Sequence, residues 1–346
     1  MDSIELSFCI PTYNRAQVVF SLVTDILLCC DSNIEVVVLD NGSTDDTLSV
    51  LSVINDDRLR VYSNGENKGA LFNMVNVLNK GKGKFLVYST DQDHVDFKRI
   101  SEFKRFISQQ FNLAGGYCAF NSTSEIEYEI FPMGYQAIKK IAYQGRHPTG
   151  YFFRNDFLKS IKLVDRFSDY AFVDLFPLEF VFAELCLLGN GAIYHRSIFT
   201  PETGEMVVTH KSSTTDGKSS KAFFSPEARL KMAVNYSKHI NSLRLTERER
   251  DLLISDVFIH GLISATLGYK FVLSDQKLCT HYYMERRNIK SKELFDIAFS
   301  FYTRYIRECI EIVGSGFFDH VQFNIHIAFG LCHRLANKAC TLLVSK

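Results

Sequence analysis

The chain has 346 residues, of which 46% are hydrophobic and 23% charged, and its 39 basic residues balance its 39 acidic ones. This composition is typical of a globular protein with one large domain or two ordinary ones. A net charge of zero gives no support for a nucleic-acid-binding domain, since such domains are usually basic.

Strands and helices alternate through the first 96 residues. Residues 6–10 predict a strand that Pro11 ends, and residues 35–39, 59–62 and 85–88 predict three further strands. Helical segments over 16–30, 47–54 and 70–79 separate these strands. This alternation predicts an α/β fold with a mostly parallel sheet and helices on both faces.

The second half follows a different pattern. His147-Pro148-Thr149-Gly150 interrupts the chain before a predicted strand at 151–153, a helix at 175–188 and a short strand at 192–194. Residues 211–221 are rich in Ser, Thr, Gly and Lys and predict a flexible loop. From about residue 223 the pattern is helical, so we expect an α/β domain over 1–215 and an all-helical domain over 222–346.

Cysteine usage and the apolar runs bear on location. The nine cysteines include no Cys-x-x-Cys pair, which argues against a zinc or redox site and suits reduced core thiols in a cytosolic protein. The N-terminus lacks the basic start and apolar stretch of a signal peptide. No apolar run reaches the roughly 18 uncharged residues expected of a membrane-spanning helix.

Asp91-Gln92-Asp93 is the most informative motif. It follows the apolar strand 85–88, and open α/β sheets bind ligands at the carboxyl ends of their strands. Two nearby carboxylates repel each other unless a cation lies between them, and Mg²⁺ or Mn²⁺ takes oxygen ligands. The motif predicts a metal and phosphate site, although a short acidic turn alone is also consistent with a solvated loop.

Three other motifs lie at strand ends or helix starts. Pro11-Thr12-Tyr13-Asn14-Arg15 ends the first strand, residues 40–47 end the second, and Asn67-Lys68-Gly69 opens the helix that contains Asn73. Each is a common turn or cap sequence when taken alone. Their occurrence in this order, each at the end of a strand or the start of the next helix, indicates a ligand site.

In this order the motifs resemble the GT-A glycosyltransferases of family 2, such as bacterial O-antigen and capsule sugar transferases. The resemblance covers residues 4–96, continues with fewer matching residues over 147–213, and is absent from the C-terminal helices. It implies the GT-A form of the Rossmann-like fold, with a nucleotide-sugar half over about 1–96 and an acceptor half over about 97–215. It also implies inverting transfer of a sugar from a nucleotide-diphosphate sugar, which we expect to be UDP-linked, to a hydroxyl of a glycan or lipid-linked glycan. The expected setting is bacterial surface polysaccharide synthesis, and the expected cofactor is Mn²⁺ or Mg²⁺.

The resemblance assigns roles to individual positions. It implies that Asp40 accepts a hydrogen bond from uracil N3–H, that Asp93 chelates the metal, and that Asp91 contacts ribose or metal. Many members have Asp-Ser-Asp-Asp where this chain has residues 90–93, which makes the register of Asp91 less secure than that of Asp93. The expected nucleotide-sugar-binding residues are Pro11, Thr12, Tyr13, Asn14, Arg15, Asp40, Asn41, Gly42, Asn67, Gly69, Asn73, Asp91 and Lys211.

Inverting transfer also needs a general base, usually a carboxylate. The family's Glu-Asp pair is absent, and we favour Asp174, which precedes Pro177 in a loop, over Glu179 and then Asp169. A helix cap or a solvated carboxylate is the alternative for each.

The family's late segment suggests further ligands. His210 is the expected third metal ligand, beside Asp91 and Asp93, and Lys211 is expected to neutralise a phosphate from a lid over 211–221. His195 is a less favoured metal ligand than His210. His94 is expected to be exposed, or to contact the metal ligands without binding the metal itself.

Alternative functions remain open at this point. A nucleotidyltransferase of similar fold would usually carry a Gly-rich basic phosphate loop, which residues 11–15 do not form. A non-catalytic carbohydrate-binding protein on the GT-A fold fits poorly with the retained Asp40, Asp91 and Asp93.

The C-terminal helices predict a packed bundle or a homo-oligomer interface, in preference to a membrane-surface helix that suits a lipid-linked acceptor. We expect a cytoplasmic protein, with peripheral contact at the inner face of the plasma membrane as an option.

Overall fold

The computed structural model describes residues 4–120, 122–163, 177–200, 224–281 and 284–344. The chain divides into two compact units, Met1–Thr214 and Thr215–Lys346.

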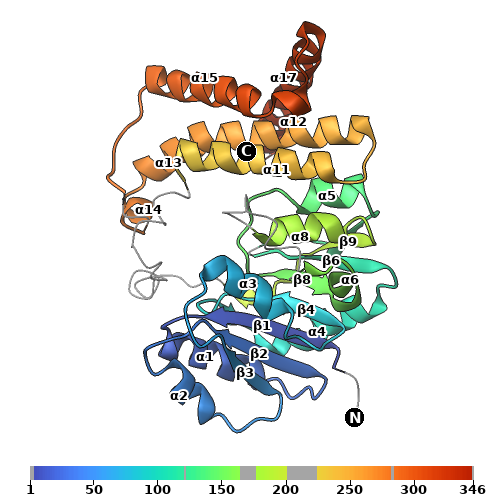
Figure 1. Cartoon of the computed structure of the whole chain (residues 1–346), viewed down its shortest axis with the longest axis vertical. Coiled ribbons are helices and arrows are strands. Elements are labelled where there is room, and N and C mark those ends of the chain that lie inside the picture. The colour runs from blue at the N-terminus through green and yellow to red at the C-terminus, as the bar shows by residue number, and fades with distance from the viewer. Residues whose placement is uncertain (1–3, 121, 164–176, 201–223, 282–283, 345–346) are drawn as a thin grey trace. The chain divides into compact units, whose positions relative to one another are not determined.

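The first unit is built on an eight-stranded sheet in the order β3-β2-β1-β4-β8-β6-β9-β7 (Figure 1). Neighbouring strands are parallel from β3 to β4 and between β6 and β9, whereas β8 and β7 run antiparallel to their neighbours. A separate two-stranded ladder joins β10 and β5. The predicted mostly parallel sheet is therefore confirmed. The strands are β1 Leu6–Thr12, β2 Ile34–Asp40, β3 Leu59–Ser63, β4 Phe85–Tyr88, β5 His94–Val95, β6 Leu113–Cys118, β7 Tyr128–Phe131, β8 Tyr151–Arg154, β9 Asn190–Tyr194 and β10 Phe199–Thr200.

Helices cover both faces of this sheet. On one face α1 and α4 form a buried core with alternate residues of β1, β2 and β4, because successive side chains of a strand point to opposite faces. Helix α3 packs on β1 and β2, and α5 and α8 pack on strands of the other half of the sheet. The helices of this unit are α1 Ala16–Leu27, α2 Thr47–Ser52, α3 Ala70–Leu78, α4 Phe97–Gln109, α5 Tyr135–Ile141, α6 Asn155–Ser160 and α8 Pro177–Leu185.

Pro11 does not end the first strand, so that boundary prediction was wrong. Strand β1 continues to Thr12, which pairs with Asp40 of β2. The pairing of β1 with β4 stops at Cys9, so β1 has only one neighbour at Pro11. Proline lacks an N–H group and is tolerated where one side of a strand has no ladder to form.

The second unit is helical, as expected. Phe258 of α12 contacts two other helices of this unit, with its ring centroid 4.8 Å from that of Tyr305 of α15 and 5.5 Å from that of Phe323 of α17. Ser225 caps α11 ahead of Pro226, and Thr246 forms a capping box with Glu249 at the start of α12. The helices are α11 Pro226–Ser242, α12 Glu247–Ile263, the π-helical turn η1 Ser264–Gly268, α13 Tyr269–Ser274, α14 Gln276–His281, α15 Ser291–Glu308, α16 Ile310–Val313 and α17 Phe317–Val344.

One continuous helix in the described part of the chain, Glu247–Ser274, is long and apolar enough to cross a membrane by length and composition alone. Asp256 interrupts its apolar run, and 44% of its most apolar window is buried inside the structure. Its first part, α12, packs against α11 and α17. A core helix of a bundle meets the same criterion, so the finding is weak support for a membrane span.

Two helices of this unit also expose apolar side chains. On α17, Phe323 and Ile327 are buried, whereas Val321, Ile325 and Phe329 are exposed at four-residue spacing. On α15, the exposed rings of Phe295 and Phe299 stack with centroids 6.3 Å apart.

Candidate active site

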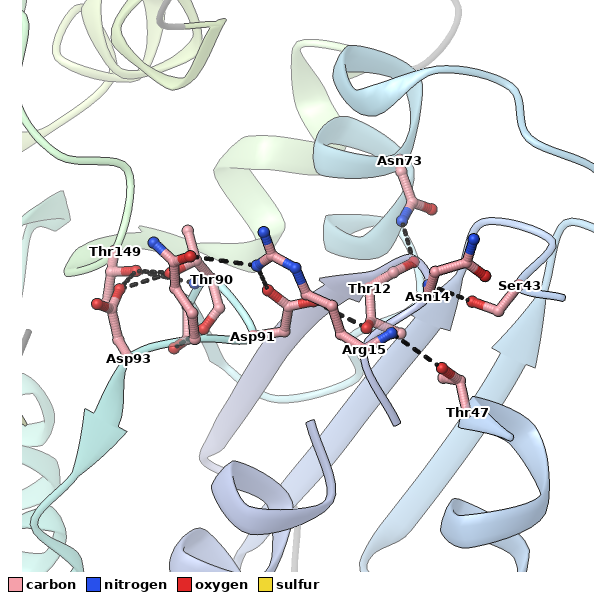
Figure 2. Close-up of polar contacts among 12 residues, drawn as sticks. Thr12, Asn14, Arg15, Ser43, Thr47, Asn73, Thr90, Asp91, Asp93 and Thr149 are labelled. Carbon is pink, nitrogen blue, oxygen red and sulfur yellow. Dashed lines mark hydrogen bonds and ion pairs between the residues drawn. The ribbon is translucent and has the colours of Figure 1, made fainter. Parts of the chain in front are cut away.

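The carboxyl ends of β1, β2 and β4 lie at one edge of the sheet, and the polar side chains that follow these strands gather there (Figure 2). Thr12 is the last residue of β1 and Asp40 the last of β2, while Asp91 and Asp93 follow β4 within five residues. Asn73 reaches the same edge from α3. This is the edge at which open α/β sheets bind ligands.

Arg15 joins the loop after β1 to the loop after β4. Its Nη1 lies 2.5 Å from Asp91 Oδ1 and donates to Gln92 Oε1 at 3.2 Å. Thr12 Oγ1 donates to the other oxygen of Asp91 at 2.8 Å. Burial raises the pKa of Asp91, while Arg15 and Thr12 act in the opposite direction. Gln92, the departure from the family pattern, therefore serves as an additional acceptor for Arg15.

Asp93 is held by two threonines. Its Oδ2 accepts a hydrogen bond from Thr90 Oγ1 at 2.6 Å and another from Thr149 Oγ1 (Figure 2). The backbone N–H of Thr90 donates to Thr149 Oγ1 at 2.8 Å, so the loop before β8 is fastened to the loop after β4. Thr149 belongs to the segment 147–150, for which the sequence predicts only a break before the next strand. No sequence signal marks Thr149 as a partner of Asp93.

Asp40 is fully buried, and its carboxylate accepts hydrogen bonds from the loop that follows it. Its carboxylate accepts hydrogen bonds from the backbone N–H groups of Gly42 and Ser43 at 3.1 Å, and from Ser63 Oγ at 2.9 Å. These contacts shape the turn after β2. The contact between Asp40 and a uracil ring stays a prediction.

Asparagine side chains organise the neighbouring loop. Asn41 Nδ2 donates to Asn67 Oδ1 at 2.9 Å, and Asn64 Nδ2 donates to both Asn41 Oδ1 and Asn73 Oδ1 at 3.0 Å. Asn73 Nδ2 in turn donates to the carbonyls of Leu39 at 2.9 Å and Thr12 at 3.3 Å. The structure thus brings together Asn41 from one motif with Asn67 and Asn73 from another, and adds Asn64 to them.

The loop after β1 is tied to the loop after β2. Asn14 has a left-handed backbone with φ 51°, and its N–H donates to Ser43 Oγ at 2.8 Å. The N–H of Thr44 donates to Asn14 Oδ1 at 2.8 Å. Pro11 and Tyr13 are partly exposed beside these contacts. Residues 11–15 and 40–44 therefore form one surface.

Glycines allow the turns of this surface. Gly42 has φ +74°, and a Cβ atom there would lie 2.5 Å from the backbone of Glu66. Gly69 has φ +89° at the start of α3, where a Cβ would meet nothing within 4 Å. Gly42 is therefore needed for close packing of two loops, and Gly69 for its backbone conformation alone.

Glu179 occupies the first turn of α8 and is fully buried. Its Oε1 accepts the backbone N–H of Arg146 at 2.8 Å and the hydroxyl of Tyr151 at 3.1 Å. The guanidinium of Arg146 lies 4.9 Å from the centroid of the Tyr117 ring. Glu179 thus anchors the chain on both sides of residues 147–150, and this geometry does not support a role as general base.

Several expected residues lie outside the described residues, namely Asp169, Asp174, His210 and Lys211. The two alternative histidines have other partners. His195 Nε2 lies 2.9 Å from Glu129 Oε1 and its Nδ1 lies 2.8 Å from Ser122 Oγ, whereas His94 Nδ1 lies 3.9 Å from Asp25 Oδ2. None of the contacts among the described residues joins His195 to Asp91 or Asp93.

The side chains at the end of β4 include donor atoms of the kinds that bind divalent cations. Asp93 is a buried carboxylate beside an accessible imidazole, His147, whose Nδ1 lies 3.6 Å from Asp93 Oδ2. Asp91 is already paired with Arg15. Within the described ranges no three His, Cys, Asp or Glu side chains gather into a metal site. Mg²⁺ and Mn²⁺ sites of nucleotide enzymes typically use one or two carboxylates and complete their coordination with phosphates and water.

The sheet order, the carboxylates at the end of β4 and the helices on both faces define a GT-A glycosyltransferase fold. Residues 7–182 match the model of the glycosyl transferase family 2, and the chain belongs to this family.

Curated relatives match a shorter part of the chain. The UDP-Glc:alpha-D-GlcNAc-diphosphoundecaprenol beta-1,3-glucosyltransferase WfaP of Escherichia coli is 27% identical over 134 residues, which are 36% of this chain and 53% of that protein. The GalNAc(5)-diNAcBac-PP-undecaprenol beta-1,3-glucosyltransferase of Campylobacter jejuni is 26% identical over 141 residues, which are 40% of this chain and 46% of that protein. The chain therefore spans about half the length of the curated relatives it matches.

A solved structure supports the fold over a longer range. S. aureus TarS 1-349 in complex with UDP-GlcNAc superimposes with a TM-score of 0.58 at 18% identity, covering 88% of this chain and 81% of that one. At this identity the likeness concerns the fold.

Proposed function

We propose that this protein is an inverting glycosyltransferase that moves a sugar from a nucleoside-diphosphate sugar, UDP-linked, to a hydroxyl of a lipid-linked glycan. The observation that carries the proposal is the buried set Thr12, Arg15, Asp91 and Asp93 at the carboxyl ends of β1 and β4. UDP is supported by the UDP-sugar in the names of WfaP and of the TarS complex. A lipid-linked acceptor in surface polysaccharide synthesis is supported by the undecaprenol diphosphate substrates in the names of both relatives.

The proposed division of labour follows the contacts. The loops after β1 and β2 hold the nucleoside, with Asp40 and the asparagine cluster setting their shape. We place the donor diphosphate beside Asp93 and His147, whose Oδ2 and Nδ1 atoms lie 3.6 Å apart. A bound Mn²⁺ or Mg²⁺ would neutralise charge on the departing diphosphate. The acceptor oxygen attacks the anomeric carbon, the bond from that carbon to the diphosphate breaks, and a carboxylate of the acceptor half, Asp174 by prediction, takes the hydroxyl proton.

The alternatives have no observation in their favour. The one cation of the 11–15 loop, Arg15, is buried against Asp91 and Gln92, which is not the exposed basic phosphate loop expected of a nucleotidyltransferase. A non-catalytic binding protein would show donor binding without turnover.

A donor screen followed by a transfer assay tests the proposal. The purified chain is heated with UDP-, GDP- and dTDP-sugars, with and without Mn²⁺, and we expect stabilisation by UDP-sugars. Transfer to a synthetic polyprenyl-diphosphate sugar is then followed by mass spectrometry, with the product's anomeric configuration read by NMR. We expect Asp174→Asn to abolish transfer and to leave donor stabilisation intact, with Asp156→Asn, an exposed carboxylate on α6, as the matched control. An absence of donor binding to the wild-type chain would contradict the enzymatic proposal.

For location, we propose a cytoplasmic protein with peripheral contact at the membrane through its helical unit. Phe295 and Phe299 are 68% and 61% exposed, and the exposed Lys290 and Lys292 precede them. The acidic Glu293 and the exposed Asp296 lie on the same turns, so the exposed rings supply most of the proposed contact and the lysines add attraction to anionic lipids. We expect the chain to float with anionic liposomes and the double variant F295S/F299S to remain in solution. Flotation that is unchanged in the double variant would contradict this contact.

We propose that the chain forms a homo-oligomer through the exposed apolar stripe of α17, which consists of Val321, Ile325 and Phe329. Light scattering of the wild type and of I325K tests it, since a charge on this face would separate the copies. Identical masses for both proteins, whether monomeric or oligomeric, would contradict this surface.

A further inference from the structure

His147 and Asp93 form a pair that none of the sequence motifs indicates. Their Nδ1 and Oδ2 atoms are 3.6 Å apart. The side chain of Asp93 is 2% exposed, whereas that of His147 is 41% exposed. The pair thus offers a fixed buried oxygen and a nitrogen that a ligand from solvent can reach.

The loop that carries His147 is held on both sides. On one side the N–H of Arg146 is bound by Glu179, and on the other Thr149 donates to Asp93. Gly150 has φ +100°, and a Cβ there would lie 2.7 Å from the carbonyl oxygen of Cys118, so the loop packs closely on β6. The position of His147 therefore follows from packing on its neighbours.

The ring of His147 has one further contact that limits its orientation. The ring of Phe120 meets it edge to face, with centroids 5.7 Å apart and an interplanar angle of 90°. Pro148 restricts the backbone of His147 to extended conformations. The imidazole is thus positioned with Nδ1 toward Asp93.

The distance between the two atoms distinguishes two kinds of contact. At 3.6 Å the pair is too long for a direct hydrogen bond. Two ligands that each lie about 2.1 Å from one ion are separated by roughly 3 to 4 Å. The observed separation fits two ligands of one ion, and it also lies within the range of an ion pair that a protonated His147 would form with Asp93.

We propose that His147 is the nitrogen ligand of the divalent cation at Asp93, an inference that rests on the proposed metal-dependent function. Asp93 supplies the oxygen ligand, and the donor diphosphate and water complete the coordination. Imidazole suits transition metals better than Mg²⁺, so the site prefers Mn²⁺ over Mg²⁺. In this arrangement Glu179 and Thr149 are positioning residues for the two ligands.

Electron paramagnetic resonance of Mn²⁺ on the full chain tests this inference without turnover. With UDP present, the pulsed spectrum of Mn²⁺ bound to wild-type protein labelled with ¹⁵N-histidine is expected to show ¹⁵N coupling from one imidazole. His147→Ala should lose that coupling and bind Mn²⁺ about tenfold more weakly. His94→Ala is the matched control, because His94 directly follows Asp93 and its Nδ1 faces Asp25 instead. It should keep both the coupling and the affinity.

Each other outcome overturns the inference. Mn²⁺ bound to the wild type without histidine coupling, or coupling that persists in His147→Ala and disappears in His210→Ala, rejects His147 and leaves the proposed function standing. No Mn²⁺ binding by the wild type in the presence of UDP rejects the proposed metal dependence together with this ligand. Because the ring of His147 is partly exposed, we expect His147→Ala to fold. Circular dichroism of the variant, compared with that of the wild type, checks this.

Discussion

Arg15 Nη1 lies 2.5 Å from Asp91 Oδ1, and both side chains are less than a tenth exposed. The two residues are 76 positions apart in the chain. This ion pair joins the loops that follow two neighbouring strands, and it holds one of the two site carboxylates in place.

Removing the cation from this pair should be costly. In Arg15→Met, Asp91 stays buried without its partner, and we expect the free energy of unfolding to fall by about 3–5 kcal/mol. Arg15→Lys should lose less, because it keeps a charge but not the second contact to Gln92. Urea unfolding followed by circular dichroism measures both. Equal free energies of unfolding for Arg15→Met and wild type would show that the ion pair does not stabilise the fold.

Gly42 and Gly65 offer a matched pair of glycines, since both have φ +74°. Gly65→Ala meets nothing within 4 Å and should cost about 1–2 kcal/mol for its left-handed backbone. Gly42→Ala carries the same cost and also places Cβ 2.5 Å from the backbone of Glu66. We therefore expect a larger loss of stability and of UDP binding in Gly42→Ala. Similar values for the two variants in thermal unfolding and calorimetry would count against the close loop contact.

Asn73 is expected to matter more than its neighbour on α3. Its buried amide donates to the carbonyls of Leu39 and Thr12, so Asn73→Ala leaves buried acceptors without their donor and should cost about 1–3 kcal/mol. Asn76→Ala is the control, because its amide bonds only to the exposed carbonyl of Phe72. It should change stability by less than about 0.5 kcal/mol. Chemical denaturation of both variants checks the difference.

The cysteines should differ sharply in reactivity. Cys30 and Cys332 are exposed, whereas Cys118 is buried, and that burial raises its pKa to about 12. The thiolate is the reactive form, so iodoacetamide at pH 8 should modify the first two in the folded protein and spare Cys118. Peptide mass spectrometry identifies the modified positions. Rapid native labelling of Cys118 would mean that β6 is less well packed than described.

Glu227 predicts a small pH effect on the helical unit. The hydrogen-bonded guanidinium of Arg304 lowers the pKa of Glu227, against the opposing effect of burial. A lowered folded pKa gives stability that is present above the ordinary glutamate pKa and is lost as the pH falls through the lowered value. Because both side chains are exposed by a third or more, we expect less than about 1 kcal/mol. Urea unfolding of wild type and Glu227→Gln at pH 7 and pH 3 should show a smaller difference at pH 3 than at pH 7.

Much of the fold could be predicted because its signals are local. The apolar run 85–88 becomes β4 without a change of boundary, and the run 35–39 becomes β2 with one more residue at each end. Such runs specify buried strands through their own hydrophobicity, whatever lies next to them. Pro11 was misjudged because a proline's effect depends on whether a second strand lies beside it, which the sequence does not state.

The sequence by itself therefore determined where the strands β1, β2 and β4 lie, although not the residue at which β1 ends, and which carboxylates follow β4, since both depend on neighbours in the chain. Only the tertiary structure decided what those side chains contact. It paired Asp91 with Arg15, placed Thr149 and His147 beside Asp93, and buried Glu179 against Arg146. The physical reason is that hydrogen bonds and ion pairs within a site join segments that are far apart in the chain, and only packing of the sheet brings those segments together.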